Sequence, residues 1–311
     1  MAKGGPDLLP VHSVAQQRVR VDWWTAQVVR AMRARGLHPV LLKGPAVARW
    51  LYADDPLSRP YVDSDLMVCA AERAGAEAVL SELGFEQPAP SWLRDEPPHA
   101  KGWVRRSDGA QVDLHRTLHG CEHVPESAVW DVVSNGTETI DVAGVDVEIP
   151  SVGVRALHLA LHAIPEFGGL TSQPFIDLER ALCVVDRRTW EGAARLAEGL
   201  GVDDEMGYRL GLVDRGRGLA LELGLQTVAP LRVRAETRAL FHLRSLRGLR
   251  AKLRYVFQKL FPPPAYLSAV TGIGLGPASL ARGYAARLGS IFYRGPRAVV
   301  ALRRARRGPG R

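Results

Sequence analysis

Two aspartates one residue apart stand at the start of an apolar run, in the stretch SRPYVDSDLMV at residues 58–68. Alternate residues of a strand point to the same face, so Asp63 and Asp65 are expected to share one. Two carboxylates on one face repel each other unless cations lie between them. A hard dication such as Mg²⁺ (or Mn²⁺) prefers oxygen ligands and takes one or two protein carboxylates beside substrate phosphates. The pair therefore indicates a metal site for phosphoryl-transfer chemistry.

A third carboxylate occurs further along the chain, in the segment VDLH at residues 112–115. We expect this segment to form a strand beside the first, which would bring Asp113 to the Asp63–Asp65 pair. Three carboxylates can hold two metal ions, which clamp the attacking and leaving oxygens of a phosphoryl transfer. The predicted catalytic and metal-binding residues are therefore Asp63, Asp65 and Asp113.

A candidate phosphate-binding turn precedes these aspartates. In LLKGPAVARW, residues 41–50, a strand leads through Gly44 into a helix. A glycine at such a junction lets the backbone approach a polyphosphate, and a helix N-terminus favours anions. Lys43 and Arg59 are the nearby residues expected to neutralise phosphate charge. The predicted nucleotide-binding residues are therefore Lys43, Gly44 and Arg59.

Two pairs of histidines, His115–His119 and His158–His162, have a spacing of four residues. On a helix this spacing puts both rings on one face, so the pairs could build a zinc or di-metal phosphohydrolase site. The alternative is a half-buried helix face whose histidines only pack, and no H-E-x-x-H or C-x-x-C motif supports zinc. We expect His115 to point to the opposite strand face from Asp113 and to support the sheet.

The remaining pattern predicts the elements that position these residues. Helical spacing and glycine stops predict helices, and short apolar runs bounded by turn residues predict strands and hairpins. The predicted elements are a helix at 13–36, a strand at 38–43, a helix at 46–52, a strand at 63–69, a helix at 71–85, hairpins that turn at 107–109 and 143–144, and helices from Ser151 onward.

The composition shifts near residue 150. We therefore predict a catalytic domain over 1–150, a helical region over 151–300 and a basic tail over 301–311 that is expected to be disordered. Residues 232–311 carry a charge of +17, whereas the preceding residues carry −9. The basic region would suit nucleic acid or another phosphate-rich partner, or would form a solvated arginine-rich helix face.

Compartment and membrane association are predicted from simpler features. Three cysteines without a short spacing argue against a disulfide framework and suit a reducing cytoplasm. No signal peptide is visible, and the longest uncharged stretch, 260–281, is too interrupted by proline and glycine to span a membrane. We therefore expect a cytoplasmic protein with no membrane span.

Taken together, the motifs VLLKGPAVARWLY, SRPYVDSDLMV and GAQVDLHRTLH resemble those of the uncharacterised nucleotidyltransferase family within the polymerase-beta-like superfamily, which is found in bacteria. The resemblance covers most of residues 35–300, where LHLALH, DLERAL and LFPPPAYL also match, and the first 120 residues hold its specific motifs. One departure is Pro45 after Gly44, because proline has no N–H to donate to a phosphate. The matching residues are Lys43, Gly44, Tyr52, Arg59, Asp63, Asp65, Leu66, Asp113, Leu114 and His115.

The resemblance implies an α+β fold, with a minimal nucleotidyltransferase core of a short mixed sheet flanked by helices and a helical C-terminal region. It also implies Mg²⁺-dependent transfer of a nucleoside monophosphate from an NTP to an unknown acceptor, which could be a small molecule, a peptide or protein, or RNA. By the same resemblance, Asp113 would deprotonate the acceptor and Gly44 would lie against the triphosphate. The alternatives are a catalytically silent nucleotide- or nucleic-acid-binding protein of the same fold, and the histidine–aspartate phosphohydrolase.

Overall fold

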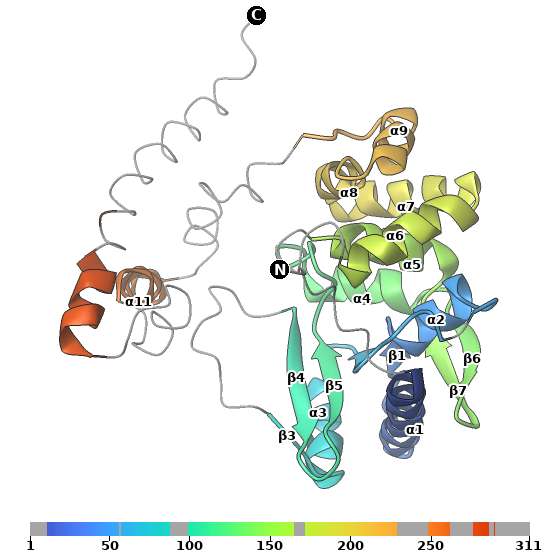
Figure 1. Ribbon diagram of the computed structural model, residues 1–311, viewed down its shortest axis with the longest axis horizontal. Coiled ribbons are helices and arrows are strands. Elements are labelled where there is room, and N and C mark those ends of the chain that lie inside the picture. Colours follow the sequence, from blue (N-terminus) through green and yellow to red (C-terminus); the bar gives the residue numbers. More distant parts are fainter. Residues whose placement is uncertain are drawn as a thin grey trace, which may run out of the picture. The chain divides into compact units, whose positions relative to one another are not determined.

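The computed structural model describes residues 11–55, 57–87, 99–164, 172–228, 248–261, 276–285 and 289 of the 311-residue chain. The chain divides into two compact units. The first comprises Met1–Ala89 with His99–Val228, and the second comprises Pro90–Pro98 with Ala229–Arg311. The two units are therefore considered separately (Figure 1).

The first unit is organised around a mixed sheet of seven strands within the described residues. Their spatial order is β3-β4-β5-β2-β1-β7-β6. The β2–β5 and β1–β7 pairs are parallel, and the other neighbouring pairs are antiparallel. The strands are β1 (Val40–Leu41), β2 (Ser64–Met67), β3 (Phe85–Glu86), β4 (Ala100–Arg105), β5 (Ala110–His115), β6 (Glu138–Val142) and β7 (Val145–Ile149).

Both faces of the sheet centre are buried, and the strand alternation decides which core each residue joins. Leu41 and Leu66 pack with the first helices of the chain, α1 (Val11–Arg33) and α3 (Arg73–Glu82). Their sequence neighbours Val40 and Met67 pack on the other face with the later helices. This two-sided burial explains why β1 and β2 are apolar runs rather than alternating ones.

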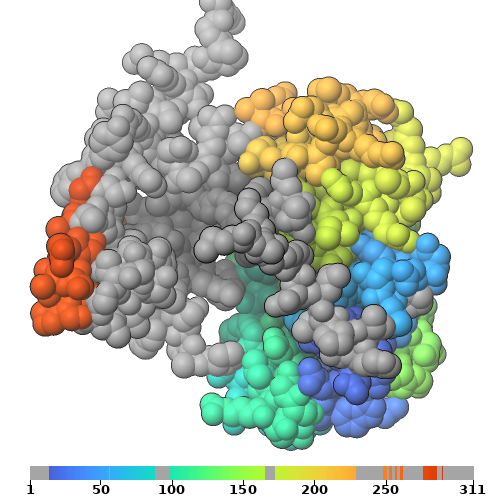
Figure 2. Space-filling model, viewed as in Figure 1, coloured from blue at the N-terminus to red at the C-terminus, as the bar shows by residue number. Residues whose placement is uncertain are grey.

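The helical part that follows β7 packs against the sheet within this same unit. The helix α7 (Arg187–Leu200) has Asp186 as its N-cap, whose side chain accepts a hydrogen bond from Thr189 N, and the left-handed Gly201 as its C-cap. In Figure 2 the light-blue surface of the α2 region abuts the yellow-green surface of the α6 region, in line with the contacts between these two helices. The helices are α2 (Pro45–Leu51), α4 (Glu126–Ser134), α5 (Val152–His162), α6 (Gln173–Val184), α7 (Arg187–Leu200), α8 (Asp203–Leu210) and α9 (Asp214–Glu222).

The second unit contains α11 (Leu249–Leu260), in which the Phe257 ring lies 5.2 Å from that of Phe261. The Phe261 ring also lies 6.3 Å from that of Tyr284. The predicted tail at 301–311 lies outside the described residues, as does most of the LFPPPAYL segment. Among the helices that are described, none combines the length and the apolar character that a membrane crossing needs.

The predicted fold class is confirmed, because a mixed sheet with helices on both faces is followed by a helical region. Both hairpins turn where the sequence predicts. The strand predicted at 38–43 is shorter, since β1 covers only Val40–Leu41 and one further backbone hydrogen bond, from Leu42 N to Asp65 O at 2.8 Å, continues its pairing with β2. The domain boundary near residue 150 stays a prediction.

Candidate active site

Asp65 and Asp113 lie side by side in the centre of the sheet. β2 and β5 are parallel, and their register pairs Asp65 with Asp113 and Met67 with His115. Ligand atoms of Asp65, Asp113 and His115 all lie within 4.8 Å of one another. On the other side of Asp113, β4 supplies Gly102, where an added Cβ would stand 3.3 Å from the Asp113 carboxylate. The sheet therefore brings together two of the three predicted carboxylates.

The expectation for His115 was wrong. His115 follows Asp113 by two residues, so strand alternation places both on the same face rather than on opposite faces. The Nε2 atom of His115 lies 2.9 Å from Asp65 Oδ1, and its Nδ1 lies 3.3 Å from the Thr117 carbonyl oxygen. The ring is fully buried. It is therefore part of the acidic site, not a packing residue beneath it.

Asp65 is 3% exposed and has two cationic or hydrogen-bonding partners. Burial by itself would raise its pKa, but the charge of Lys43 and the hydrogen bond from His115 outweigh burial and hold the pKa of Asp65 well below its usual range. The Lys43 Nζ atom lies 2.9 Å from Asp65 Oδ1. Asp65 is therefore ionised at neutral pH.

Asp63 lies one residue before β2 and has the opposite electrostatic behaviour. Its burial, followed by the negative charges of Asp65 and Asp113, raises its pKa to about 7. Lys43 and His115 act against this rise and only partly offset it. The site thus concentrates more negative charge than its own cations balance, which is the condition that a bound dication would relieve.

The predicted phosphate turn lies directly against these aspartates. Gly44 has a φ of +58°, and a Cβ at this position would meet the Asp63 carbonyl oxygen at 3.0 Å. Only glycine therefore fits both the backbone conformation and the close approach. Pro45 opens α2, a position where its missing N–H costs no helical hydrogen bond. The Gly44 backbone therefore packs directly against the backbone of Asp63.

Arg59 has a different set of contacts from those expected of a phosphate ligand. Its guanidinium donates to both oxygens of Asp177, at 3.0 Å from Nε to Oδ1 and 2.8 Å from Nη2 to Oδ2. Its Nη1 donates to the Gly44 carbonyl at 3.3 Å. Tyr52 OH and Gln173 Nε2 also donate to Asp177 Oδ1, each at 2.8 Å. Arg59 is 6% exposed and Asp177 is 3% exposed, so the pair is buried.

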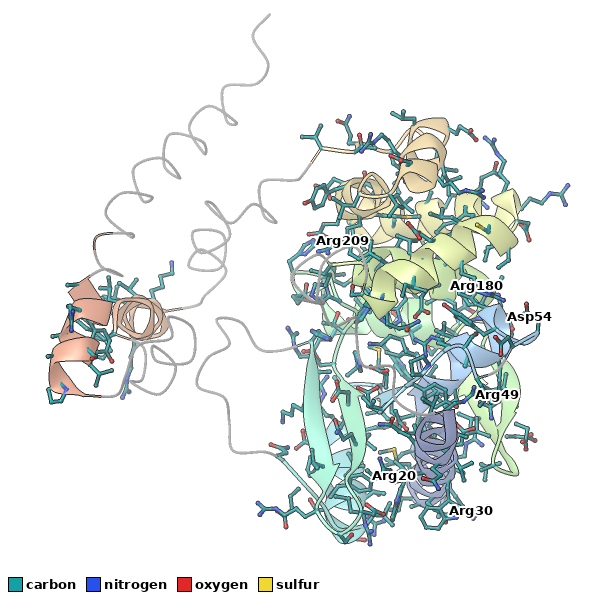
Figure 3. All side chains as sticks on the ribbon, in the orientation of Figure 1. Arg20, Arg30, Arg49, Asp54, Arg180 and Arg209 are labelled. Carbon is teal, nitrogen blue, oxygen red and sulfur yellow. The ribbon has the colours of Figure 1, made fainter. Side chains whose placement is uncertain are left out.

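This buried pair connects the Gly44 turn to α6. The contact continues at the surface, where Arg180 donates to Asp54 at 2.5 Å and lies over the Tyr52 ring at 4.5 Å (Figure 3). Sequence reasoning missed Asp177, although DLERAL contains it. The available signal was an aspartate in the first half of an otherwise amphipathic helix, whereas Arg59 was predicted to bind phosphate instead.

Histidines from two elements of the first unit, β5 and α5, converge beside Asp65. His162 Nε2 lies 3.1 Å from Lys43 Nζ, and the rings of His158 and His162 are 5.9 Å apart. The His158 ring also lies 6.4 Å from that of His115. Burial, followed by the charge of Lys43, holds the pKa of both α5 histidines well below the usual range. These imidazoles are therefore neutral at pH 7 and face the site, not solvent.

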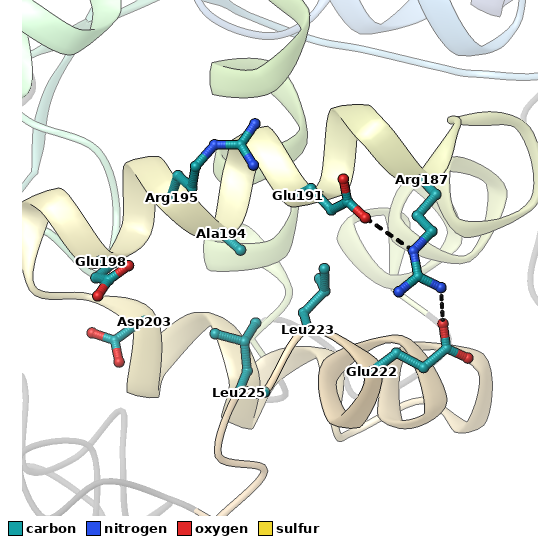
Figure 4. A pocket seen from close by; sticks show the side chains of 10 residues that line it. Arg187, Glu191, Ala194, Arg195, Glu198, Asp203, Glu222, Leu223 and Leu225 are labelled. Atoms are coloured by element: carbon teal, nitrogen blue, oxygen red, sulfur yellow. Dashed lines mark hydrogen bonds and ion pairs between the residues drawn. The ribbon is translucent and has the colours of Figure 1, made fainter.

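A polar pocket of about 440 Å³ lies elsewhere in the first unit, between α7, α8 and the end of α9 (Figure 4). Arg187 crosses its rim and pairs with Glu191 at 3.0 Å and with Glu222 at 2.8 Å. None of the residues predicted to be catalytic or nucleotide-binding lines it. The candidate site is therefore the carboxylate group on β2 and β5, not this pocket.

A central acidic pair on parallel strands, next to a lysine–glycine turn, is a layout suited to nucleotidyl transfer. The model of a family described as "Uncharacterised nucleotidyltransferase" matches residues 11–215. The chain therefore belongs to the uncharacterised nucleotidyltransferase family, as its motifs predicted, and it is a transferase by class.

Three solved structures match part of this chain, each with low identity and a TM-score below 0.5. A solution structure of the antibiotic-resistance factor ANT(2″)-Ia has 15% identity and a TM-score of 0.41, over 60% of this chain and 94% of that one. A crystal structure of ANT(2″)-Ia with adenylyl-2″-tobramycin has 15% identity and a TM-score of 0.42, over 58% and 98%. An antigenic nucleotidyltransferase-like protein from Paracoccidioides brasiliensis has 13% identity and a TM-score of 0.38, over 62% and 93%. No curated protein matches.

Proposed function

We propose that this protein transfers a nucleoside monophosphate from an NTP to a hydroxyl or phosphate oxygen of an acceptor. The observation that carries the proposal is the pairing of Asp65 with Asp113 across two parallel strands, with Lys43 Nζ 2.9 Å from Asp65 and Gly44 packed against Asp63. These are the groups that such a transfer needs: carboxylates for cations and a cationic, glycine-lined turn for phosphates.

The donor set fits a divalent metal. Asp65 and Asp113 supply oxygen ligands within reach of one point. Burial, followed by the charges of Asp65 and Asp113, raises the pKa of Asp63, and a bound cation would favour its ionised form. Asp63, Asp65 and Asp113 would hold Mg²⁺ or Mn²⁺. When bound, such ions neutralise phosphate charge and stabilise the attacking and leaving oxygens of an in-line displacement.

The chain's own residues would perform the other tasks. The Lys43 ammonium would bind the triphosphate together with the Gly44 backbone. Arg59 would act through the turn, because its guanidinium holds the Gly44 carbonyl and is itself fixed by Asp177. Asp113 would accept the proton of the acceptor hydroxyl while the hydroxyl oxygen attacks the α-phosphorus of the NTP. The bond between the α- and β-phosphates breaks, and pyrophosphate leaves.

The acceptor is proposed to bind against the helical region at 151–300, and the basic stretch at 232–311 would favour an acceptor rich in phosphate, including RNA. The acceptor panel should therefore include RNA ends, peptides, cell-extract metabolites and sugar hydroxyls. Since ANT(2″)-Ia is described in complex with adenylyl-2″-tobramycin, aminoglycosides form a further arm of that panel.

The test is pyrophosphate release and label transfer from α-labelled NTPs, with Mg²⁺ or Mn²⁺ and the acceptor panel. Asp65→Asn should reduce transfer at least ~1000-fold, since it removes a carboxylate that acts in the transition state. The matched control is Asp146→Asn, an exposed aspartate of the β6–β7 hairpin. Transfer at the wild-type rate by Asp65→Asn would refute the assignment of the site.

The same assay separates the alternatives. Release of inorganic phosphate without label transfer would favour the histidine–aspartate phosphohydrolase. A silent binding protein would show neither product in any arm, and its affinity for nucleic acid would fall steeply with salt without a need for Mg²⁺.

A further inference from the structure

We propose that His99, His119 and Glu122 form a second metal site, separate from the three aspartates, which binds one transition-metal ion of the Zn²⁺ type. The site lies beside the proposed nucleotidyl-transfer centre and shares no residue with it. This proposal does not depend on the proposed function, because it concerns metal binding alone.

The three side chains already point at a common position. A ligand atom from each lies within 4.8 Å of the other two. His119 Nε2 and Glu122 Oε1 are 3.9 Å apart, and the rings of His99 and His119 are 5.0 Å apart. Two ligands at about 2.1 Å from one ion can be at most about 4.2 Å apart. Small rotations of these side chains are therefore enough to close the group around an ion.

The backbone holds these residues in place before any ion binds. The His99 carbonyl accepts hydrogen bonds from the N–H groups of Arg116 at 2.8 Å and Thr117 at 3.3 Å, which ties the start of β4 to the end of β5. The chain then turns tightly, with Cys121 N donating to Leu118 O at 3.1 Å and Val124 N to Cys121 O at 2.9 Å. His119 and Glu122 both lie on this 118–124 turn.

Gly120 fixes the position of this turn against the helices behind it. It has a φ of +85°, and an added Cβ would lie 3.3 Å from Leu161 of α5 and 3.7 Å from Glu205 of α8. A larger residue would push the turn away from the helices. The tight packing of Gly120 therefore keeps the side chains of His119 and Glu122 directed toward His99.

The ligand types select the kind of metal. Two imidazoles and one carboxylate suit Zn²⁺ and similar first-row ions, whereas Mg²⁺ prefers oxygen ligands only. Three protein ligands also leave one coordination position open for water or another oxygen ligand. The carboxylates of Asp65 on β2 and Asp113 on β5 supply oxygen ligands and therefore suit Mg²⁺ instead.

The second site is connected to the first through aromatic contacts. The His99 ring lies 5.3 Å from that of His115, which contacts Asp65. The His119 ring lies 6.4 Å from that of His162, which contacts Lys43. An ion held by His99, His119 and Glu122 would therefore adjoin the acidic centre without replacing its ligands.

The experiment uses the full-length, tag-free protein, stripped with a chelator, dialysed and titrated calorimetrically with ZnCl₂. Metal content after dialysis and the visible absorption of a Co²⁺-loaded sample give independent readouts. The wild type should bind Zn²⁺ at a site that excess MgCl₂ does not empty. His119→Gln and Glu122→Gln should each weaken this binding at least ~10-fold and remove the Co²⁺ bands.

Two control variants decide where the ion binds. His38→Gln changes an exposed histidine that pairs with Glu72, and it should bind Zn²⁺ as the wild type does. Asp65→Asn should also retain Zn²⁺, because Asp65 belongs to the other group. Loss of Zn²⁺ in Asp65→Asn with normal binding in Glu122→Gln would overturn the proposal, as would a wild type that binds none. Glu122 is partly exposed, so its variant can be tested even if His119→Gln does not fold.

Discussion

Two buried ion pairs flank the Gly44 turn, and they are built differently. Arg59 and Asp177 form a forked pair in which the carboxylate accepts further hydrogen bonds from Tyr52 and Gln173. Lys43 and Asp65 form a pair through a single atom of each side chain, with two histidines as additional neighbours. The first pair joins the turn to a helix, and the second joins the turn to the sheet.

The difference follows from the chemistry of the two cations. A guanidinium is planar and always charged, so it locks a carboxylate in one geometry, whereas an ammonium is a compact charge on a flexible stem that can change partners. Arg59 is thus suited to hold a conformation. Lys43 is suited to leave Asp65 for a phosphate when a nucleotide arrives.

Breaking the forked pair should have the largest effect on stability. Asp177→Asn leaves a buried guanidinium without its counter-charge and should lower the free energy of unfolding by ~3–5 kcal/mol. The measurement is urea denaturation followed by far-UV circular dichroism. The matched control is Asp54→Asn, which removes the exposed partner of Arg180 and should leave the midpoint unchanged. Equal midpoints for the two variants would contradict a structural role for Asp177.

The raised pKa of Asp63 predicts how stability depends on pH near the lysine pair. Its folded-state pKa of about 7 lies above the ordinary 3.8, so between these values the folded state binds more protons than the unfolded state. The contribution of Asp63 to stability therefore decreases as the pH rises through this range, by on the order of 2–4 kcal/mol. The excess stability of Asp63→Asn over the wild type should be smallest near pH 4, where Asp63 is protonated in the folded state and partly protonated in the unfolded state, and largest at pH 8.

The measurement is the thermal melting of the wild type and of Asp63→Asn across this pH range, without divalent metal. The difference in stability between the two proteins removes the contribution of the other titrating groups that they share. A difference that does not change with pH would show that neither burial nor the charges of Asp65 and Asp113 raise the pKa of Asp63 in the folded state.

Removing the Lys43 ammonium should affect the rate of transfer more than the stability of the fold, in contrast to Asp177→Asn. Lys43→Met should reduce transfer ~100-fold, which is about 2.7 kcal/mol of transition-state stabilisation. Asp65 keeps its hydrogen bond from His115, so this variant should lose less stability than Asp177→Asn. Initial rates with saturating acceptor are the measurement, and Lys101→Met, which removes an exposed pair with Glu77, is the control. An unchanged rate would exclude Lys43 from phosphate binding.

The local parts of the site could be predicted from the sequence. The D-x-D spacing, the strand around Asp113 and the glycine after Lys43 each depend on patterns within a few residues, and the structure has them where expected. The position of His115 was also within reach, since alternation places it beside Asp113.

The long-range parts could not be predicted. Arg59 and Asp177 are 118 residues apart, and no local pattern specifies that they pair. The histidine cluster depends on α5 packing behind β5 and on the turn at Gly120, which requires the complete strand order. The pairing of Asp177 with Arg59 and the contact of His162 with Lys43 are tertiary contacts, and the sequence did not predict them.

The contact from α6 to the Gly44 turn has a practical consequence for engineering. Ending the chain after β7 would take away the acceptor of both the Arg59 guanidinium and the Tyr52 hydroxyl, and it would uncover the apolar side of Val40 and Met67. A chimera that combines the sheet of one family member with the helices of another would fold only if the incoming helix carries an aspartate in the place of Asp177. The sheet and its helices would then have to be exchanged together as a single cassette.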